Sequence, residues 1–144
     1  MPANPDRLTL LVVDDEPGIL WSLALLLRDA GYRVVTHSAG GDALAWLQAD
    51  AGGCDLAVID GKLRDIDGIE LAMRIRAETS CRAPLIMMSG YFNRDDRALA
   101  DALRGGLIAE FLSKPFRHDA MLATIHRVLC LGTDTPTSAA APRR

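Results

Sequence analysis

The stretch LLVVDDEPG, residues 10–18, decides how the chain is expected to fold. Four apolar residues lead straight into Asp14, Asp15 and Glu16, which are followed by a proline and a glycine. An apolar run bounded by turn-forming residues is typical of a buried β-strand. Adjacent carboxylates at the end of such a strand repel one another and lose favourable hydration. We therefore expect these acids to serve a purpose other than folding.

Short apolar segments alternate with longer amphipathic segments along the chain. We predict five strands, at residues 8–13, 32–37, 56–60, 83–89 and 108–112. We predict helices at residues 19–31, 40–50, 68–78 and 94–105, the last capped by Asn93, and a fifth helix after Pro115. Strict alternation of strand and helix indicates a parallel sheet with helices on both faces. The expected fold is α/β and flavodoxin-like: a doubly wound, five-stranded parallel sheet in the order 2-1-3-4-5 with five helices.

A chain of 144 residues suffices for one domain with a buried core. We expect this domain to cover residues 8–131, after a flexible N-terminus at residues 1–7. Residues 132–144 are rich in Pro, Ala, Ser and Thr and have no apolar periodicity, so we expect a disordered tail or a linker. The sequence leaves open whether the chain is a stand-alone protein or a fragment of a longer one.

Composition and charge exclude several classes of function. A net charge of -3 argues against direct nucleic-acid binding by this domain. No apolar run reaches the roughly 20 residues of a membrane span, and the N-terminus lacks the pattern of a signal peptide, so we expect a cytoplasmic protein that does not bind membranes. Cys54, Cys81 and Cys130 are odd in number and form no C-x-x-C pair, which favours thiols without a special role over a disulfide framework or a zinc site.

Polar residues gather where the predicted strands end. Asp14 and Asp15 follow the first strand, Asp60 ends the third, Ser89 ends the fourth and Lys114 follows the fifth. In the order 2-1-3-4-5 the first and third strands are neighbours, so three carboxylates converge on one edge of the sheet. Oxygen ligands of this kind suit Mg²⁺, or Mn²⁺ in its place, and a lysine and a hydroxyl beside them suit a phosphoryl group. This pattern predicts a site for phosphoryl transfer.

Four motifs carry a resemblance to a known family. VVDDE (12–16), VIDGKLRDIDG (58–68), MMSGY (87–91) and FLSKPF (111–116) resemble the receiver domain of two-component response regulators, in the CheY-like superfamily. The resemblance covers about residues 8–130, and each motif falls at the matching strand end in the matching order. It implies a signalling protein that catalyses only its own phosphorylation and dephosphorylation and is otherwise not an enzyme.

The resemblance implies a role for each residue at the acidic edge. Asp60 is similar to the phospho-acceptor, which takes a phosphoryl group from a phosphohistidine of a sensor histidine kinase or a histidine phosphotransfer protein. Asp15 matches the main Mg²⁺ ligand, Asp14 acts mostly through a bound water, and Asp60 and the backbone carbonyl of Lys62 complete the protein ligands. Lys114 matches the lysine that pairs with the phosphoryl group.

The resemblance also implies a conformational switch. Ser89 matches the hydroxyl that moves toward the phosphorylated aspartate, and Phe111 matches the aromatic residue whose ring then turns inward. The peptide bond before Pro115 is expected to be cis. Phosphorylation would change the surface formed by the fourth helix, the fifth strand and the fifth helix. An output domain, an effector protein or a second copy in a homodimer would bind this surface.

The chain departs from the common pattern of the family at several positions. Arg64 stands where proline is usual, and Gly90 stands where alanine is frequent. The loop RGGLIAEF, residues 104–111, is longer than usual. Lys62 lies two residues beyond Asp60, and Tyr91 lies two residues beyond Ser89. We hypothesise that these two side chains shield the acyl phosphate from water. The alternative is that both point to solvent.

The first predicted helix carries an apolar patch on its outer face. Helical spacing places Trp21, Ser22 and Leu25 away from the face that packs on the sheet. Exposed apolar patches mark partner surfaces, and in the family this helix helps to dock the phosphodonor. We therefore predict that these residues dock the donor, with a dimer contact or cover by the tail as the alternative.

Three other functions compete with phosphorylation signalling. A phosphohydrolase with an aspartate nucleophile needs a second aspartate two residues later, where this chain has Lys62. A flavodoxin-like cofactor binder needs a phosphate-binding loop after the first strand, where this chain has Asp14, Asp15 and Glu16. A receiver-like module that binds partners without being phosphorylated stays open as the third alternative.

Overall fold

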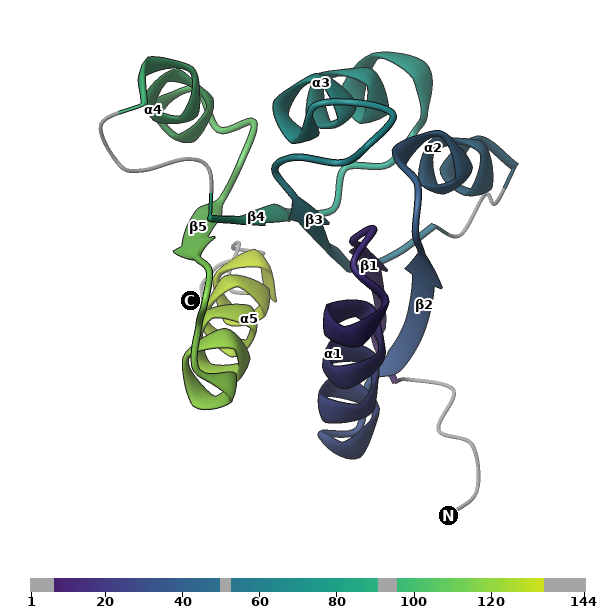
Figure 1. Ribbon diagram of the computed structural model, residues 1–144, viewed down its shortest axis with the longest axis vertical. Coiled ribbons are helices and arrows are strands. Elements are labelled where there is room, and N and C mark those ends of the chain that lie inside the picture. Colours follow the sequence, from purple (N-terminus) through teal and green to yellow (C-terminus); the bar gives the residue numbers. More distant parts are fainter. Residues whose placement is uncertain (1–6, 50–52, 91–95, 134–144) are drawn as a thin grey trace.

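The computed structural model describes residues 7–49, 53–90 and 96–133 (Figure 1). Its centre is a sheet of five parallel strands in the order β2-β1-β3-β4-β5. The strands are β1 (Thr9–Val13), β2 (Arg33–His37), β3 (Leu56–Asp60), β4 (Leu85–Ser89) and β5 (Glu110–Ser113). The predicted doubly wound, flavodoxin-like sheet of five strands is therefore confirmed, with its strand order.

Five helices cover the two faces of the sheet. They are α1 (Pro17–Asp29), α2 (Gly40–Ala49), α3 (Gly68–Glu78), α4 (Arg97–Arg104) and α5 (His118–Thr133). Figure 1 shows α1 and α5 on one face, and α2, α3 and α4 on the other. None of the helices in these described ranges is long and apolar enough to span a membrane.

One hydrophobic core lies on each face of the sheet. Alternate side chains of a strand point to opposite faces, so β3 and β4 contribute to both cores and are buried at every position. On the α1 and α5 face, Leu23 and Leu27 pack with Met121 and Ile125. The central strands are thus held firmly from both sides, and their ends are fixed in space.

Element boundaries differ from the predicted ones mainly in the second half of the chain. β5 begins at Glu110 rather than at residue 108, because Ile108 is buried in the connection after α4, where its amide bonds to Ala102. α4 begins at Arg97, and its cap is Asp96, whose carboxylate accepts from the amide of Leu99 at 3.1 Å. The predicted cap Asn93 lies outside the described residues. α5 extends to Thr133, two residues into the segment predicted as a tail.

The register of the strands brings their carboxyl ends to one edge. Val13 pairs with Ile59, so the residues that follow β1 lie beside Asp60 at the end of β3. Asp60 pairs with Met88, and Ser89 pairs with Ser113. The polar residues predicted at the strand ends therefore converge along the edge where β1, β3, β4 and β5 end.

Gly68 holds the loop after β3 close to the end of that strand. Its amide donates to the carbonyl of Gly61 at 2.9 Å, and a Cβ at this position would lie 2.6 Å from the carbonyl oxygen of Asp60. Real Cβ atoms do not approach backbone this closely, so only glycine fits here. The loop from β3 to α3 depends on this contact for its path.

We predict that Gly68→Ala lowers the melting temperature by roughly 4–10 °C, because the added methyl group must push the backbone of residues 60–61 away. Gly18→Ala is the matched control: it adds the same methyl group near the start of α1, where nothing lies within 4 Å. Thermal unfolding followed by circular dichroism measures both. Equal melting temperatures for the two variants would contradict the prediction.

Candidate functional site

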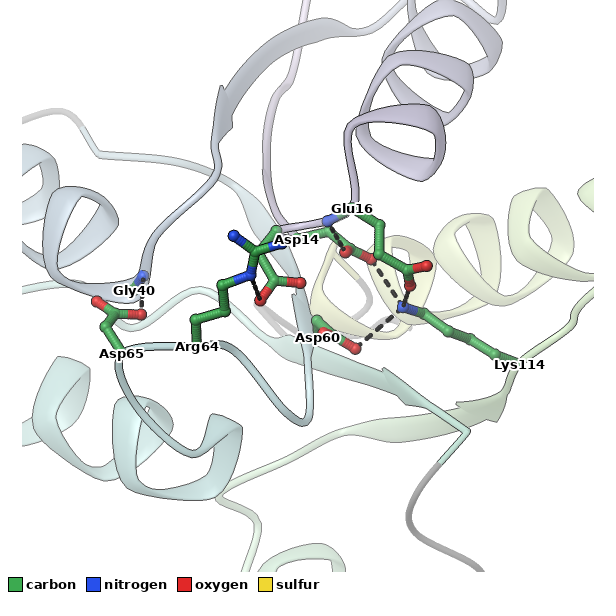
Figure 2. A network of polar contacts seen from close by, with 8 residues as sticks. Asp14, Glu16, Gly40, Asp60, Arg64, Asp65 and Lys114 are labelled. Atoms are coloured by element: carbon green, nitrogen blue, oxygen red, sulfur yellow. Dashed lines mark hydrogen bonds and ion pairs between the residues drawn. The ribbon is translucent and has the colours of Figure 1, made fainter.

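The ammonium of Lys114 lies at the centre of the polar edge (Figure 2). Its Nζ donates to Asp14 Oδ2 at 2.9 Å and to Glu16 Oε1 at 3.1 Å, and it lies 3.1 Å from Asp60 Oδ1. These partners come from the turn after β1 and from the end of β3, whereas Lys114 follows β5. One cation therefore joins three strand ends that are far apart in the sequence.

Three carboxylates are close enough to share a metal ion. One oxygen from each of Asp14, Asp15 and Asp60 lies within 4.8 Å of the others. Asp14 and Asp60 are buried, and Asp14 Oδ1 accepts from the amide of Glu16 at 2.8 Å. Buried oxygen ligands gathered in this way suit a hard divalent cation such as Mg²⁺.

Burial and the charge of Asp14 raise the pKa of Asp60 to about 6, and the nearby Lys114 ammonium offsets only part of that rise. Burial alone would lower the pKa of Lys114, but its hydrogen bonds with Asp14 and Glu16 raise it instead. The edge therefore carries more negative charge than the lysine can neutralise.

The two pKa shifts have opposite effects on stability. In the folded state Asp60 keeps its proton up to about pH 6, whereas in the unfolded chain it has its ordinary pKa of 3.8. The free energy of unfolding therefore falls as pH rises from 3.8 to about 6. Above that range, the ionised Asp60 destabilises the fold by a constant amount. The raised pKa of Lys114 stabilises the fold fully below its ordinary value of 10.5, and this is lost only at more alkaline pH. At neutral pH the ammonium supports the fold while Asp60 works against it.

A pocket of about 660 Å³ opens over these carboxylates. Asp60 and Lys114 line it together with Lys62, Arg64 and Gly90, among others. The Nε of Arg64 lies 3.8 Å from Asp15 Oδ2, and the arginine side chain is 89% exposed. A phosphoryl group entering the pocket would thus meet positive charge at the mouth as well as at the centre.

Arg64 and Glu16 are site residues whose contacts could not be predicted from the sequence. Arg64 was noticeable only as a departure from the common pattern, four residues after Asp60; the structure places it against Asp15. Glu16 lies just before α1, and its carboxylate contacts Lys114, so it takes part in the charge network of the site.

The loop that carries Lys62 and Arg64 is fixed at its far end. Asp65 accepts from the amides of Gly40 and Gly41, at 3.0 and 2.8 Å, where α2 begins. Burial pushes the pKa of Asp65 up, but these two hydrogen bonds hold it below its ordinary value. The ionised side chain thus ties the loop after β3 to the second helix, as Figure 2 shows.

Of the predicted switch residues, Ser89 and Pro115 adjoin residues that line the pocket, whereas Phe111 lies in the core. Ser89 is buried, and its carbonyl accepts from the amide of Lys114 at 3.1 Å. Phe111 is buried in the core on the side of α2, α3 and α4. The peptide bond between Lys114 and Pro115 is cis, which confirms that prediction. Tyr91, the second residue of the shielding hypothesis, lies outside the described residues.

The predicted patch on α1 is exposed in the structure. Trp21 is 70% exposed and Leu25 is 54% exposed. Ser22 is half-buried, and its hydroxyl donates to the carbonyl of Ile19 at 3.3 Å. It also lines a second pocket, of about 370 Å³, that shares Glu16 and Lys114 with the first. Ser22 therefore connects α1 with the acidic site through this second pocket.

Curated proteins similar to this chain are bacterial regulators. The chain is 33% identical over 120 residues to the transcriptional regulatory protein GlrR of Escherichia coli, covering 83% of this chain and 26% of that one. It is 35% identical over 115 residues to the transcriptional regulatory protein KdpE of Mycobacterium tuberculosis, covering 80% and 48%. It is 35% identical over 121 residues to FixJ of Bradyrhizobium diazoefficiens, covering 82% and 55%. The chain thus spans about half the length of these relatives, or less.

Solved structures with the same architecture are receiver domains. A CheY-like receiver domain protein from Methanospirillum hungatei superposes with a TM-score of 0.78 at 26% identity, covering 91% of this chain and all of that one. The receiver domain of an HD domain-containing protein from Pseudomonas fluorescens gives a TM-score of 0.76 at 26% identity, covering 92% and 94%.

The family model described as the response regulator receiver domain matches residues 10–126. This range contains both the acidic carboxylates and the lysine that joins them. Receiver domains bind Mg²⁺ through an acidic pocket, and the close approach of Asp14, Asp15 and Asp60 fits that ion. The chain belongs to the receiver domain family of two-component response regulators.

Proposed function

We propose that this chain accepts a phosphoryl group on Asp60 from the phosphohistidine of a donor protein, in a reaction that depends on Mg²⁺. The observation that carries the proposal is the position of Asp60: it ends β3 at the pocket beside Lys114, with two further carboxylates within reach of one ion. At neutral pH its pKa of about 6 leaves it largely ionised, as a nucleophile requires.

The transfer step needs no other reactant. A carboxylate oxygen of Asp60 attacks phosphorus, the bond from phosphorus to the donor's histidine nitrogen breaks, and that nitrogen keeps the electron pair. Lys114, 3.1 Å from Asp60, is placed to bind an oxygen of the incoming phosphoryl group. Asp15, Asp60 and the backbone carbonyl of Lys62 would hold Mg²⁺, or Mn²⁺ in its place, with Asp14 acting through water. The ion would neutralise charge on the phosphoryl oxygens.

We propose that phosphorylation is read at the surface of α4, β5 and α5. Ser89 would move toward the phosphorylated Asp60, and Phe111 would follow it. The similar curated regulators GlrR and KdpE are transcriptional regulatory proteins, of which this chain matches about half the length or less. An output domain, an effector protein or a second copy of the chain would therefore bind the switched surface, and a histidine kinase would supply the phosphoryl group.

The alternatives have less support from this chain. Lys62, where a phosphohydrolase would need its second acid, is exposed and lines the mouth of the pocket. A partner-binding module without phosphorylation would gain nothing from the buried Asp60 carboxylate, which works against stability at neutral pH. Outside phosphoryl transfer to itself, the chain is proposed to have no enzymatic activity.

We predict that incubation with acetyl phosphate and Mg²⁺ adds one phosphoryl group to the wild-type chain and none to Asp60→Asn, since the amide is not a nucleophile. Intact-mass spectrometry measures the product, and the modification should be labile to alkali and hydroxylamine. Asp55→Asn is the control: Asp55 lies at the other end of β3, where its carboxylate accepts from the amide of Thr9 at 2.7 Å. Absence of phosphate on the wild type would leave the partner-binding module.

We predict that Arg64→Ala binds Mg²⁺ more tightly, by roughly twofold to fivefold. The arginine competes with the ion for Asp15, and an exposed ion pair of this kind is worth up to about 1 kcal/mol. Calorimetric titration of the unphosphorylated protein measures the affinity directly. Arg74→Ala is the control, because Arg74 is bound to Glu78 on α3, away from the site. Unchanged or weaker Mg²⁺ binding by Arg64→Ala would show that Arg64 does not oppose the ion.

We further propose that the α1 patch of Trp21, Ser22 and Leu25 docks the phosphodonor. Trp21 and Leu25 are apolar and exposed, and the half-buried Ser22 lines a pocket that shares Glu16 and Lys114 with the acidic site. A donor helix lying here would place its histidine near Asp60. A contact between two copies of the chain, or cover by residues 132–144, are the alternatives that the experiment must separate.

We predict that Trp21→Ala and Leu25→Ala slow transfer from an autophosphorylated sensor kinase that phosphorylates the wild type, by about tenfold or more. Phosphorylation by acetyl phosphate should stay at the wild-type rate, because the small donor needs no docking surface. Met73→Ala is the control, since Met73 is also apolar and 51% exposed but lies on α3. If the variants lose the same fraction of the transfer rate with both donors, or none with either, docking is rejected. If the variants differ from the wild type in sedimentation coefficient, the patch is a contact between two copies.

A further inference from the structure

Two cysteines far apart in the sequence meet at the edge of the sheet opposite the acidic pocket. Cys54 lies just before β3, and Cys81 lies in the segment that leads to β4. These strands are neighbours: Ala57 pairs with Leu85, and the amide of Ala57 donates to the carbonyl of Pro84 at 3.0 Å. Both thiols are half-buried against the same core, and they lie close enough for a hydrogen bond between them.

Arg76 places a positive charge beside Cys81. Its guanidinium donates to the carbonyl of Cys81 at 3.0 Å and to the carbonyl of Ala83 at 2.6 Å. These bonds fasten the segment between α3 and β4 to the last turn of α3. The segment that carries Cys81 is therefore held in a defined place, beside a cation and close to the thiol of Cys54.

The two thiols are unequal. The hydrogen bond from Cys54, together with backbone and Arg76 contacts, lowers the pKa of Cys81 below that of an ordinary thiol. The same pairing, then burial and the nearby charge of Asp55, raises the pKa of Cys54. Low-pKa thiols with a second thiol in contact are the sites where peroxide oxidation ends in a disulfide.

We propose that Cys54 and Cys81 form a dithiol site that hydrogen peroxide converts to a disulfide. The Cys81 thiolate attacks one peroxide oxygen, the oxygen–oxygen bond breaks, and the leaving hydroxide takes a proton to become water. Cys54 then loses its proton, its sulfur attacks the Cys81 sulfenic acid, and the sulfur–oxygen bond breaks with release of a second water. The two thiols lose two electrons together, and the peroxide gains them.

The disulfide would enclose β3, the loop after Asp60 and α3 in one covalent ring. Such a ring restricts the unfolded chain and so stabilises the folded one. Because the bond forms at the edge where β3 and β4 begin, it leaves the carboxylates at the opposite edge in place. The oxidised protein should therefore be more stable and should still accept phosphate at Asp60.

The test treats the reduced full chain with hydrogen peroxide. We expect an intact mass lower by two hydrogens, a non-reduced peptide that links Cys54 to Cys81, and a melting temperature higher by about 5 °C that dithiothreitol reverses. Cys130→Ser, which removes the exposed cysteine on α5, should give the same result. A link through Cys130, or oxygen addition to Cys81 in place of the disulfide, would overturn the proposal.

Single variants separate the roles of the two thiols. In Cys54→Ser, the sulfenic acid on Cys81 should persist and be captured by dimedone; in Cys81→Ser, Cys54 should not react. In the wild type, iodoacetamide at pH 7 should alkylate Cys81 at least about fivefold faster than Cys130, and Arg76→Gln should reduce that ratio. If Cys81 reacts no faster than Cys130, the site is not activated and the proposal fails. None of these measurements depends on phosphorylation of Asp60.

Discussion

The ion pairs of Lys114 are the interaction on which the acidic edge of the sheet depends. The parallel register brings the ends of β1 and β3 together, so that Asp14 and Asp60 are buried close to each other whatever their charge. The lysine ammonium, within 3.1 Å of both, is what makes this arrangement tolerable in the absence of another cation. Since Lys114 follows β5, its ion pairs also connect the end of β5 to the ends of β1 and β3 at the centre of the sheet.

One ammonium among four carboxylates leaves the edge short of positive charge, so Lys114 offsets only part of the rise in the pKa of Asp60 that burial and the charge of Asp14 cause. A fully neutralised site would be more stable, but it would have little affinity for a divalent ion and would hold its nucleophile in ion pairs. Stability is given up here at the place where chemistry is proposed, as is common at functional sites. Arg64 supplies part of the missing charge from the mouth of the pocket, in a contact loose enough to be replaced.

The fold and the central carboxylates could be predicted from the sequence because both depend on simple periodicity. Alternating segments define a parallel sheet, and a parallel sheet puts all strand ends with Asp14, Asp60 and Lys114 on one edge. The start of β5 was misplaced because burial of Ile108 looks the same in a strand and in a connection. The contacts of Arg64 and of the cysteines were not predictable, since they depend on where loops travel between elements rather than on any repeat.

A parallel sheet also has a second edge, where the strands begin, and this protein places different chemical groups at its two edges. Cys54 and Cys81 adjoin the starts of β3 and β4, while Asp60 and Ser89 end the same two strands. Five residues of strand separate the edges, about 17 Å. Strand-to-strand hydrogen bonds and two buried cores make this length rigid. A covalent bond at the starting edge therefore reaches the acidic edge only through the stability of the whole domain, so thiol chemistry and phosphoryl chemistry can coexist without sharing a single group.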